Sequence, residues 1–180
     1  MRIVSGQFKG RRFSPPNNLP TRPTTDQAKE AIFNVFNNNF DFENLAVLDL
    51  FTGTGNITFE FASRGVSDIT CVEQNFKCCD FIKTTSEVLG ISPRIMKADV
   101  FKWVEQNKGK KFDIIFADPP YELPHLKTIP ALIFNAGILK EGGWLVVEHP
   151  KEISFSGEEH FAWHRNYGHV NFSMFEVVQS

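Results

Sequence analysis

The sequence predicts an α/β fold: a seven-stranded, mostly parallel sheet with helices on both faces, a C-terminal antiparallel hairpin and a short N-terminal extension. Three observations predict it. From residue 46 onward, short apolar runs alternate with helical segments, which is typical of a parallel sheet. Residues 160–168 and 169–178 alternate as two antiparallel strands would, around Gly168. A length of 180 residues favours a single core.

The N-terminal extension is predicted to contain a β-hairpin and a helix. Residues 1–13 alternate weakly between apolar and polar around two glycines, which favours a short hairpin. Residues 14–23, "SPPNNLPTRP", form an irregular proline-rich connector. A helix is expected to begin near Thr24, because Thr24 and Gln27 have the spacing of a capping box and apolar residues recur at helical spacing behind them.

The rest of the chain supplies the sheet and the helices that cover it. In such sheets ligands bind at the carboxyl ends of the strands, so chemically active side chains are expected where strands end. Parallel strands are expected at 46–51, 68–73, 94–99, 112–118 and 142–149, and helices at 56–65, 75–90, 100–109 and 129–136.

Charge is distributed unevenly along the chain. Residues 1–30 hold six lysine and arginine residues against two acids, a net charge of +4, whereas the remainder has thirteen basic and nineteen acidic residues, a net charge of −6. A basic head on an acidic body favours a local contact with a polyanion. A solvated arm explains the same charges, and four net charges are a small footprint for nucleic acid.

Composition also bears on the compartment and on metals. The chain has no apolar run of 18 residues and its first residues lack the core of a signal peptide, so a cytoplasmic protein with no membrane contact is expected. Cys71, Cys78 and Cys79 match neither zinc-site nor disulfide spacing. We expect reduced, buried cysteines and no metal site.

The first predicted strand ends in "LDLFTGTGN". Gly53 and Gly55 allow a tight turn and a close approach of backbone to a ligand. A dinucleotide fingerprint requires glycine at position 58, where this chain has threonine, so a nicotinamide oxidoreductase is disfavoured. Asp49 places a carboxylate in the turn, which would repel a pyrophosphate and attract an ammonium or sulfonium group.

The second and third strands also end in acids. Glu73 can accept both ribose hydroxyls of an adenosine group, or it can serve the N-terminus of the helix that starts at Asn75. Asp99 can accept from an adenine amino group, or it can cap the helix that follows it. The residues alone leave both pairs of alternatives open.

The fourth strand ends in "DPPY", a sequence that by itself suits a tight turn. Its place at a strand end, in line with three other acids, favours a chemical role. Asp118 is an acceptor for an exocyclic amine, while Pro119 and Pro120 fix a backbone carbonyl beside it. Tyr121 can stack on the base that carries the amine. After the fifth strand, His149 is expected to be a packed structural residue.

These motifs resemble those of class I S-adenosylmethionine-dependent methyltransferases that modify amino groups of bases, which have a Rossmann-like sheet. The runs "RIVSGQFKGRRF…TRPTTDQAKEAIFNVF", "FASRG" and "YGHVNFSMFEV" narrow the resemblance to the RsmD family, the small-subunit ribosomal RNA guanine-966 N2-methyltransferases. The resemblance covers nearly the whole chain. It departs at Thr52, Thr54 and Asn56, where members often carry alanine, serine and a small apolar residue.

The resemblance implies a division of labour along the chain. Residues 1–40 would be a basic extension and helix that face RNA, and residues 41–180 the methyltransferase domain. The substrate would be 16S ribosomal RNA in the small subunit or an assembly intermediate, and the protein a monomer. The implied sites are a cofactor pocket of Asp49, Phe51, Thr52, Gly53, Gly55, Glu73, Asp99 and Val100; catalytic Asp118, Pro119 and Tyr121; and RNA contacts Arg2, Lys9, Arg11, Arg12 and Arg22, the last also reaching the active site.

Three other functions fit part of the pattern. A DNA adenine methyltransferase would use the same Asp118 and Tyr121, but this chain has little room for a target-recognition segment. A protein-glutamine methyltransferase more typically has asparagine at position 118. A non-catalytic RNA-binding assembly factor could keep the fold, but intact motifs at each strand end disfavour it.

Overall fold

A computed structural model describes residues 1–19, 21–22 and 24–177 of the chain, and the expected end of the last strand at residue 178 lies outside these residues. The helices are α1 (Asp26–Asn39), α2 (Asn56–Ser63), α3 (Phe76–Leu89), α4 (Val100–Gln106) and α5 (Ile129–Ala136), with 3-10 turns η1 (Phe42–Asn44) and η2 (Leu126–Thr128). The strands are β1 (Ala46–Leu50), β2 (Asp68–Glu73), β3 (Arg94–Lys97), β4 (Phe112–Ala117), β5 (Leu139–His149), β6 (Phe161–Tyr167) and β7 (Val170–Glu176).

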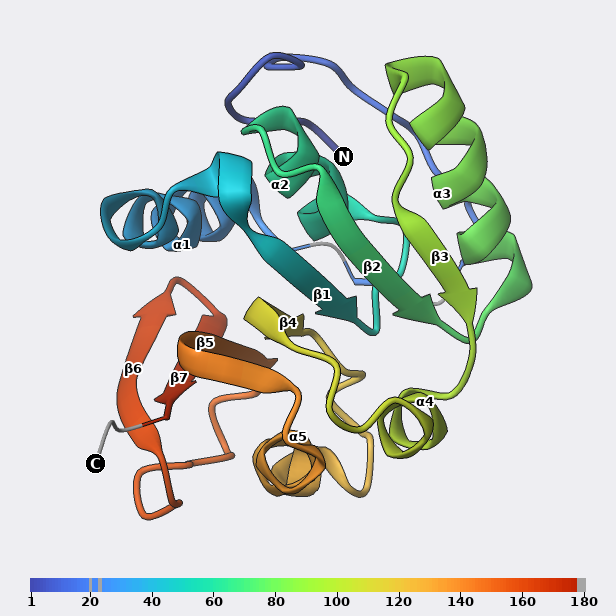
Figure 1. The fold of residues 1–180 in the computed structure, drawn as a ribbon. Coiled ribbons are helices and arrows are strands. Elements are labelled where there is room, and N and C mark those ends of the chain that lie inside the picture. Colours follow the sequence, from blue (N-terminus) through green and yellow to red (C-terminus); the bar gives the residue numbers. More distant parts are fainter. Residues whose placement is uncertain (20, 23, 178–180) are drawn as a thin grey trace.

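The seven strands form one sheet in the order β3-β2-β1-β4-β5-β7-β6. Strands β1 to β5 are parallel to one another, and β7 pairs antiparallel with both β5 and β6. Figure 1 shows the C-terminal hairpin closing the edge next to β5. The predicted Rossmann-like sheet and terminal hairpin are confirmed. Strand β5 starts at Leu139, earlier than expected, because Leu139 pairs with Phe112 across an irregularity in the register.

Helices cover the two faces of the sheet, as Figure 1 shows: α1, α2 and α3 lie on one side and α4 and α5 on the other. Strand side chains alternate between these layers. Val47 belongs to the core cluster with α1 and α2, while Leu48 belongs to the cluster with α4 and α5. Apolar burial on both faces explains why the central strands read as nearly continuous hydrophobic runs.

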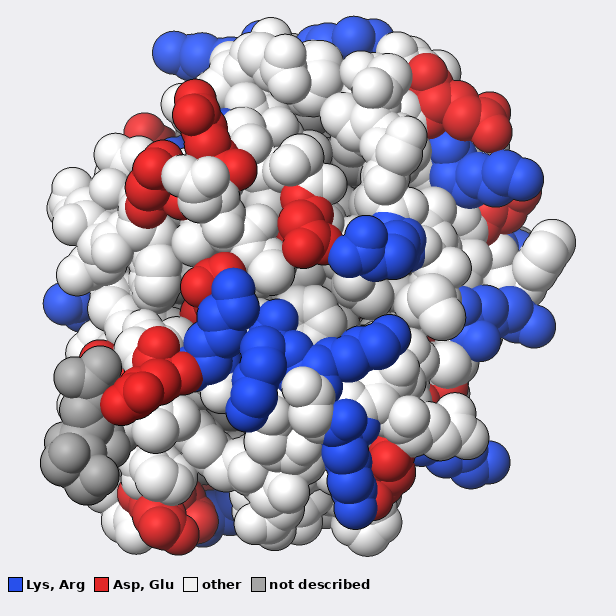
Figure 2. Space-filling model, in the orientation of Figure 1, with Lys and Arg blue, Asp and Glu red and all other residues white. Residues whose placement is uncertain are grey.

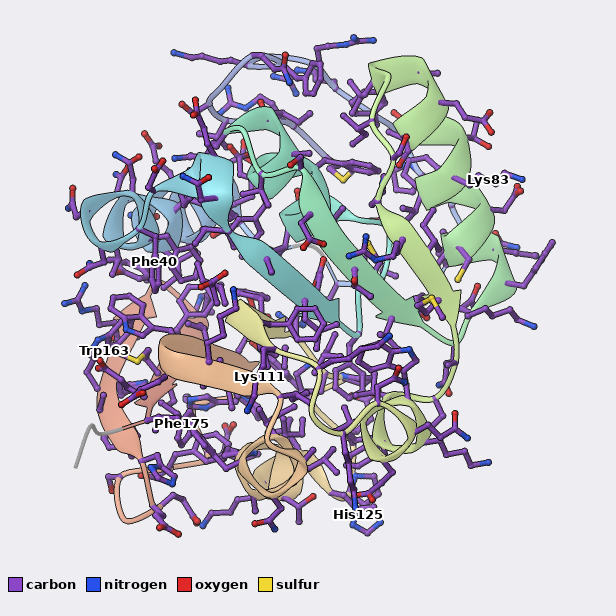
Figure 3. All side chains as sticks on the ribbon, in the orientation of Figure 1. Phe40, Lys83, Lys111, His125, Trp163 and Phe175 are labelled. Carbon is purple, nitrogen blue, oxygen red and sulfur yellow. The ribbon has the colours of Figure 1, made fainter. Side chains whose placement is uncertain are left out.

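Aromatic rings fill much of the first layer. Phe33 of α1 meets Phe61 of α2 with ring centroids 4.6 Å apart. At the end of α1, Phe40 packs edge-on against Trp144 at 5.0 Å, and Trp144 contacts Trp163 at 6.2 Å. Figure 3 labels Phe40 and Trp163 on this side of the molecule, where α1 approaches β6. Helix α1 therefore shares its core with the sheet, and the division at residue 40 stays a prediction.

Helix α1 begins two residues after the predicted position, at Asp26. Its N-cap is Thr25, whose hydroxyl accepts a hydrogen bond from the Ala28 amide at 3.2 Å. The prediction that Thr24 caps this helix is wrong. The Thr24 hydroxyl instead donates a 2.8 Å hydrogen bond to the carboxylate of Glu148, a residue far along the chain.

The N-terminal arm, residues 1–13, packs against α2. Its predicted hairpin is limited to one antiparallel bridge, between Arg2 and Arg12. The carboxylate of Glu60 accepts hydrogen bonds from the arm's backbone at Val4 and Ser5, and these bonds compete with a longer ladder. Gly6 lies so close to Ser63 that a Cβ atom would stand 2.0 Å from its carbonyl oxygen, so only glycine fits.

Two further predictions concern cysteines and membranes. Cys71, Cys78 and Cys79 are free and buried, which confirms the expectation of reduced core residues. Across residues 1–19, 21–22 and 24–177, no helix combines the length and the apolar character that a membrane span requires.

Candidate active site

A cavity of about 690 Å³ opens at the carboxyl edge of the sheet, the size of pocket that holds a small-molecule ligand. It brings together residues that are far apart in sequence, from the connector before α1 to the loop after β4. Of the predicted site residues it contains Arg22, Asp49, Phe51, Thr52, Gly53, Glu73, Asp99, Val100, Asp118, Pro119 and Tyr121.

The turn after β1 forms the floor of this cavity. Phe51 and Gly55 both have positive φ, 57° and 90°, which makes the backbone reverse sharply before α2. A Cβ atom on Gly55 would lie 2.7 Å from the ring of Phe59, so a side chain is excluded there. Gly55 does not line the cavity itself, but the shape of the turn depends on it.

Asp49 is the buried acid of this turn. Its carboxylate accepts a 2.7 Å hydrogen bond from the hydroxyl of Thr58, the residue that excludes a dinucleotide fingerprint. Burial, with a smaller contribution from the charge of Glu73, raises the pKa of Asp49 to about 7. A nearby cation would stabilise the ionised form, so Asp49 suits a positively charged ligand.

Glu73 and Asp99 have structural partners in addition to their place in the cavity. The Glu73 carboxylate accepts 2.8 Å hydrogen bonds from the amides of Gly53 and Asn75. It thereby joins the turn after β1 to the end of β2. Asp99 caps α4 by accepting from the Lys102 amide at 3.0 Å. Each carboxylate has further lone pairs for a ligand, so capping and ligand binding are compatible.

The "DPPY" segment forms the opposite wall. Asp118 follows the last residue of β4, and its amide donates to the Leu50 carbonyl of the neighbouring strand at 3.4 Å. The guanidinium of Arg22 covers the Tyr121 ring, with Cζ 3.6 Å from the ring centroid, and Nη2 donates to Asp118 at 3.3 Å. The hydroxyl of Tyr121 is buried and has no hydrogen-bond partner among the described residues.

Glu148, which the sequence analysis did not select, completes this wall. It lies near the end of β5, its side chain is 0% exposed, and it accepts from Arg22 at 2.9 Å and from Thr24 at 2.8 Å. Burial and the neighbouring Glu148 raise the pKa of Asp118 well above its usual value, and the charge of Arg22 opposes this shift. The strand-end rule that selected four acids also selects Glu148.

His149, the next residue, points elsewhere. Its ring nitrogens lie 2.7 Å from the Ser173 hydroxyl and 2.9 Å from the Pro150 carbonyl oxygen. Burial lowers the pKa of His149, which favours the neutral ring. The prediction of a packed structural histidine is confirmed.

A second missed group links the arm to the cavity. Lys29 is 0% exposed and pairs with the equally buried Glu60 at 3.3 Å. Its ammonium also donates to the Arg2 carbonyl at 2.5 Å and to the side chain of Asn56 at 2.8 Å. Asn56, one of the departures from the family pattern, also lines the cavity. One of its hydrogen-bond partners is the buried Lys29 ammonium.

The remaining basic residues of the arm lie on the surface. Lys9, Arg11 and Arg12 are exposed, and Arg2 pairs with Asp26 at 2.9 Å. In the part of the chain that the structure describes, none of these four lines the cavity. The structure therefore unites only Arg22 with the predicted catalytic residues.

Another basic group lies on a different face. Figure 2 shows lysine and arginine side chains gathered in the middle of the viewed face, where Figure 3 labels Lys111. Lys111 precedes β4, so this group lies at the opposite end of that strand from Asp118. Its ammonium donates to the Gly137 carbonyl at the end of α5, and Lys140 pairs with Asp113 at 2.9 Å. These local partners account for both lysines.

Comparison with known sequences identifies the family. A sequence model described as "Conserved hypothetical protein 95" matches residues 1–176. Ribosomal RNA small subunit methyltransferase D of Buchnera aphidicola subsp. Baizongia pistaciae is 30% identical over 155 residues, which cover 86% of this chain and 78% of that protein. The chain belongs to the RsmD family. The resemblance drawn from the motifs is confirmed.

A further relative and a solved structure are also similar to the chain. Ribosomal RNA small subunit methyltransferase D of Escherichia coli K12 is 28% identical, over 82% of this chain and 71% of that protein. The solved structure of the hypothetical protein TTHA0928 from Thermus thermophilus superposes with a TM-score of 0.87 at 24% identity, over 98% of this chain and 99% of that one. That likeness shows that the two proteins share one fold over essentially the whole chain.

The acidic residues of the site are not grouped as metal ligands would be. Within residues 1–19, 21–22 and 24–177, no three His, Cys, Asp or Glu side chains come together in a way that could hold a metal ion.

Proposed function

We propose that this protein transfers a methyl group from S-adenosylmethionine to the exocyclic N2 amine of a guanine in 16S ribosomal RNA, the guanine at position 966 by resemblance to the family. One observation carries the proposal: a single cavity holds both the acidic turn after β1 and the "DPPY" wall after β4. Methyl donor and acceptor amine would then meet in one enclosed site, and positioning alone can supply roughly 7–11 kcal/mol of the barrier.

The cofactor is assigned to the β1–β3 side of the cavity. A buried carboxylate whose pKa rises to about 7 fits a ligand that carries positive charge, which supports Asp49 as the partner of such a group. S-adenosylmethionine supplies an electrophilic methyl group on a sulfonium. The proposed contacts are Asp49, Phe51, Thr52 and Gly53 in the first turn, shaped by Gly55, with Glu73 toward the ribose and Asp99 and Val100 toward the adenine.

The acceptor base is assigned to the β4 side. Tyr121 would stack on the flipped base, and its unpartnered hydroxyl is consistent with a ligand at this wall. Asp118 and the backbone stiffened by Pro119 would accept the two N–H groups of the amine and aim its lone pair. The new N–C bond forms as the C–S bond breaks, and the amine then loses a proton to the Asp118 carboxylate or to water.

The wider partners follow from the arm and the family. Arg2, Lys9, Arg11, Arg12 and Arg22 would contact RNA phosphates on the small subunit or an assembly intermediate, in the cytoplasm, with the protein acting as a monomer. A net charge of +4 in residues 1–30 is modest, so we expect ribosomal protein surface to share the recognition. Deproteinised RNA that reacts as well as the particle would contradict this expectation.

The direct test uses labelled cofactor. The purified protein is incubated with methyl-labelled S-adenosylmethionine and small subunits that lack the modification, and the RNA is then digested to nucleosides. Label in N2-methylguanosine is the expected result, and sequencing of labelled fragments gives the position. Label only in another nucleoside, or cofactor binding without transfer to RNA, would contradict the proposal.

A further inference from the structure

Arg22 occupies the place that the proposed function gives to the base. Its guanidinium is flat, carries several N–H donors and lies 3.6 Å above the ring of Tyr121. One nitrogen donates to both Asp118, at 3.3 Å, and Glu148, at 2.9 Å. A planar group with adjacent donors therefore already stacks on the tyrosine and pairs with two carboxylates, which are properties that a nucleobase in this position needs.

Glu148 is built into the wall as a fixed acceptor. Register pairing of Ala117 with Val147 puts the ends of β4 and β5 side by side, so Asp118 and Glu148 are neighbours. The Thr24 hydroxyl donates to Oε1 of Glu148, which leaves Oε2 directed at the guanidinium. Burying a carboxylate is costly unless it is paired. Any bound group that takes the place of the Arg22 guanidinium must therefore bring a hydrogen-bond donor for Glu148.

Guanine carries matching donors on its Watson–Crick edge. Its N2 amine and its N1–H are on adjacent ring positions, whereas adenine places an unprotonated N1, an acceptor, beside its amine. We propose that Glu148 is the guanine-selecting residue of this site: Arg22 withdraws, Glu148 accepts from N1–H, and Asp118 accepts from the N2 amine. This inference rests on the proposed function, and it distinguishes the two amines that "DPPY" alone does not.

The two carboxyl groups can hold guanine without Arg22. One Arg22 nitrogen donates to both Oδ1 of Asp118 and Oε2 of Glu148, so both oxygens face the space that Arg22 leaves. Guanine brings its own donors, N1–H for Glu148 and the N2 amine for Asp118, in place of the guanidinium that leaves. Adenine would instead set its N1 lone pair against the buried Glu148 oxygen, leaving both unpaired.

The test exchanges one donor on each side of this contact. Small subunits are reconstituted with either guanine or 2-aminopurine at the target position; 2-aminopurine keeps the C2 amine but has a bare N1 and lacks O6. In the wild type, kcat/KM should favour guanine by at least about 100-fold, because 2-aminopurine leaves Glu148 unpaired. In Glu148→Gln, Thr24 donates to the amide oxygen and the amide NH₂ faces N1.

That variant should lose activity on guanine and gain on 2-aminopurine, so that the preference falls at least tenfold. Glu152→Gln, the same change at an exposed position near the end of β5, should keep the wild-type preference. A folded Glu148→Gln protein that binds the cofactor normally and keeps the wild-type preference would overturn the inference. If the variant does not fold, the wild type still decides, because equal kcat/KM on the two RNAs overturns it.

Failure of the proposed function would look different. It would show in the wild type as no transfer to guanine-containing subunits, before any variant is compared. Transfer to guanine with an unchanged preference in Glu148→Gln would leave the proposed function standing and remove only the role of Glu148.

Discussion

The guanidinium of Arg22 and the ring of Tyr121 form a stacked pair, 3.6 Å from Cζ to ring centroid, beside the Asp118 carboxyl. Arg22 comes from the connector before α1 and Tyr121 from the loop after β4, so this pair ties the N-terminal region to the cavity. It also places a permanent positive charge next to the proposed catalytic acid. The charge state of Asp118 should therefore depend on Arg22.

Replacing Arg22 should change the pH dependence of methyl transfer. The pKa of Asp118 is raised by burial and by Glu148, and Arg22 lowers it. In Arg22→Ala the pKa rises further, so the ionised acceptor forms only at higher pH and the acid limb of kcat/KM should move up by about one unit. Arg165→Ala removes an arginine that stacks on Trp163 at 4.5 Å, and should leave the limb in place. Superimposable profiles for wild type and Arg22→Ala would contradict this coupling.

Removing the Asp118 carboxylate should separate chemistry from cofactor binding. Asp118→Ala deletes the acceptor at the reacting amine, and the single-turnover rate should fall about 100- to 1,000-fold. The Kd for S-adenosylmethionine should change less than about threefold, because the cofactor is assigned to the β1–β3 side. Asp80→Ala, on the exposed face of α3, is the matched control. Parallel losses in binding and rate would place Asp118 in the cofactor site instead.

The edge of the sheet that bears the site was predictable from local sequence. Most of the parallel strands are short apolar runs, and the residues at their carboxyl ends lie along one edge of the sheet. Asp49, Glu73, Asp99 and Asp118 were located in this way, and the cavity contains all four. Glu148 obeys the same rule, but at that strand end only the neighbouring His149 was considered as a candidate.

The pairings across the site were not predictable, because they join distant parts of the chain. Arg22 and Thr24 reach Glu148 over 126 and 124 positions, and helical or strand periodicity carries no information at that range. Local capping rules favoured Thr24 as a helix cap, but its hydroxyl donates to the distant Glu148 instead. Lys29 of α1 was not singled out from the sequence, because its burial depends on Glu60 in another helix.

Cofactor affinity should rise with pH through the titration of Asp49. Burial raises its pKa to about 7, and a cationic ligand binds the ionised form. Between pH 6 and 8 the Kd for S-adenosylmethionine should fall about tenfold in the wild type, and Asp49→Asn should abolish this slope. Calorimetric titration at several pH values measures it. A wild-type Kd that is independent of pH would show that no cation binds at Asp49.

Stability without ligand should move in the opposite direction. Because the pKa of Asp49 is higher in the folded chain than in the unfolded chain, where it is 3.8, the folded state holds its proton longer. The free energy of unfolding should therefore fall as pH rises from about 4 to about 7, and this fall should be smaller in Asp49→Asn. Urea denaturation across that range is the measurement.

The buried Lys29–Glu60 pair should be a main anchor of the N-terminal arm. Lys29→Met leaves Glu60 buried without one of its cationic partners and leaves the Arg2 carbonyl without its donor, at an expected cost of about 3 kcal/mol in the free energy of unfolding. Lys83→Met, on the exposed side of α3 where Figure 3 labels it, should cost less than about 0.5 kcal/mol.

The same variant should release the arm before the core unfolds. Glu60 holds the backbone of Val4 and Ser5, and its own placement depends on Lys29. Trypsin should therefore cut after Lys9, Arg11 or Arg12 at least severalfold faster in Lys29→Met than in Lys83→Met, under conditions where both proteins remain folded. Equal cleavage rates, or a loss below about 1 kcal/mol in Lys29→Met, would mean that Arg64 alone holds Glu60 and that the arm is anchored elsewhere.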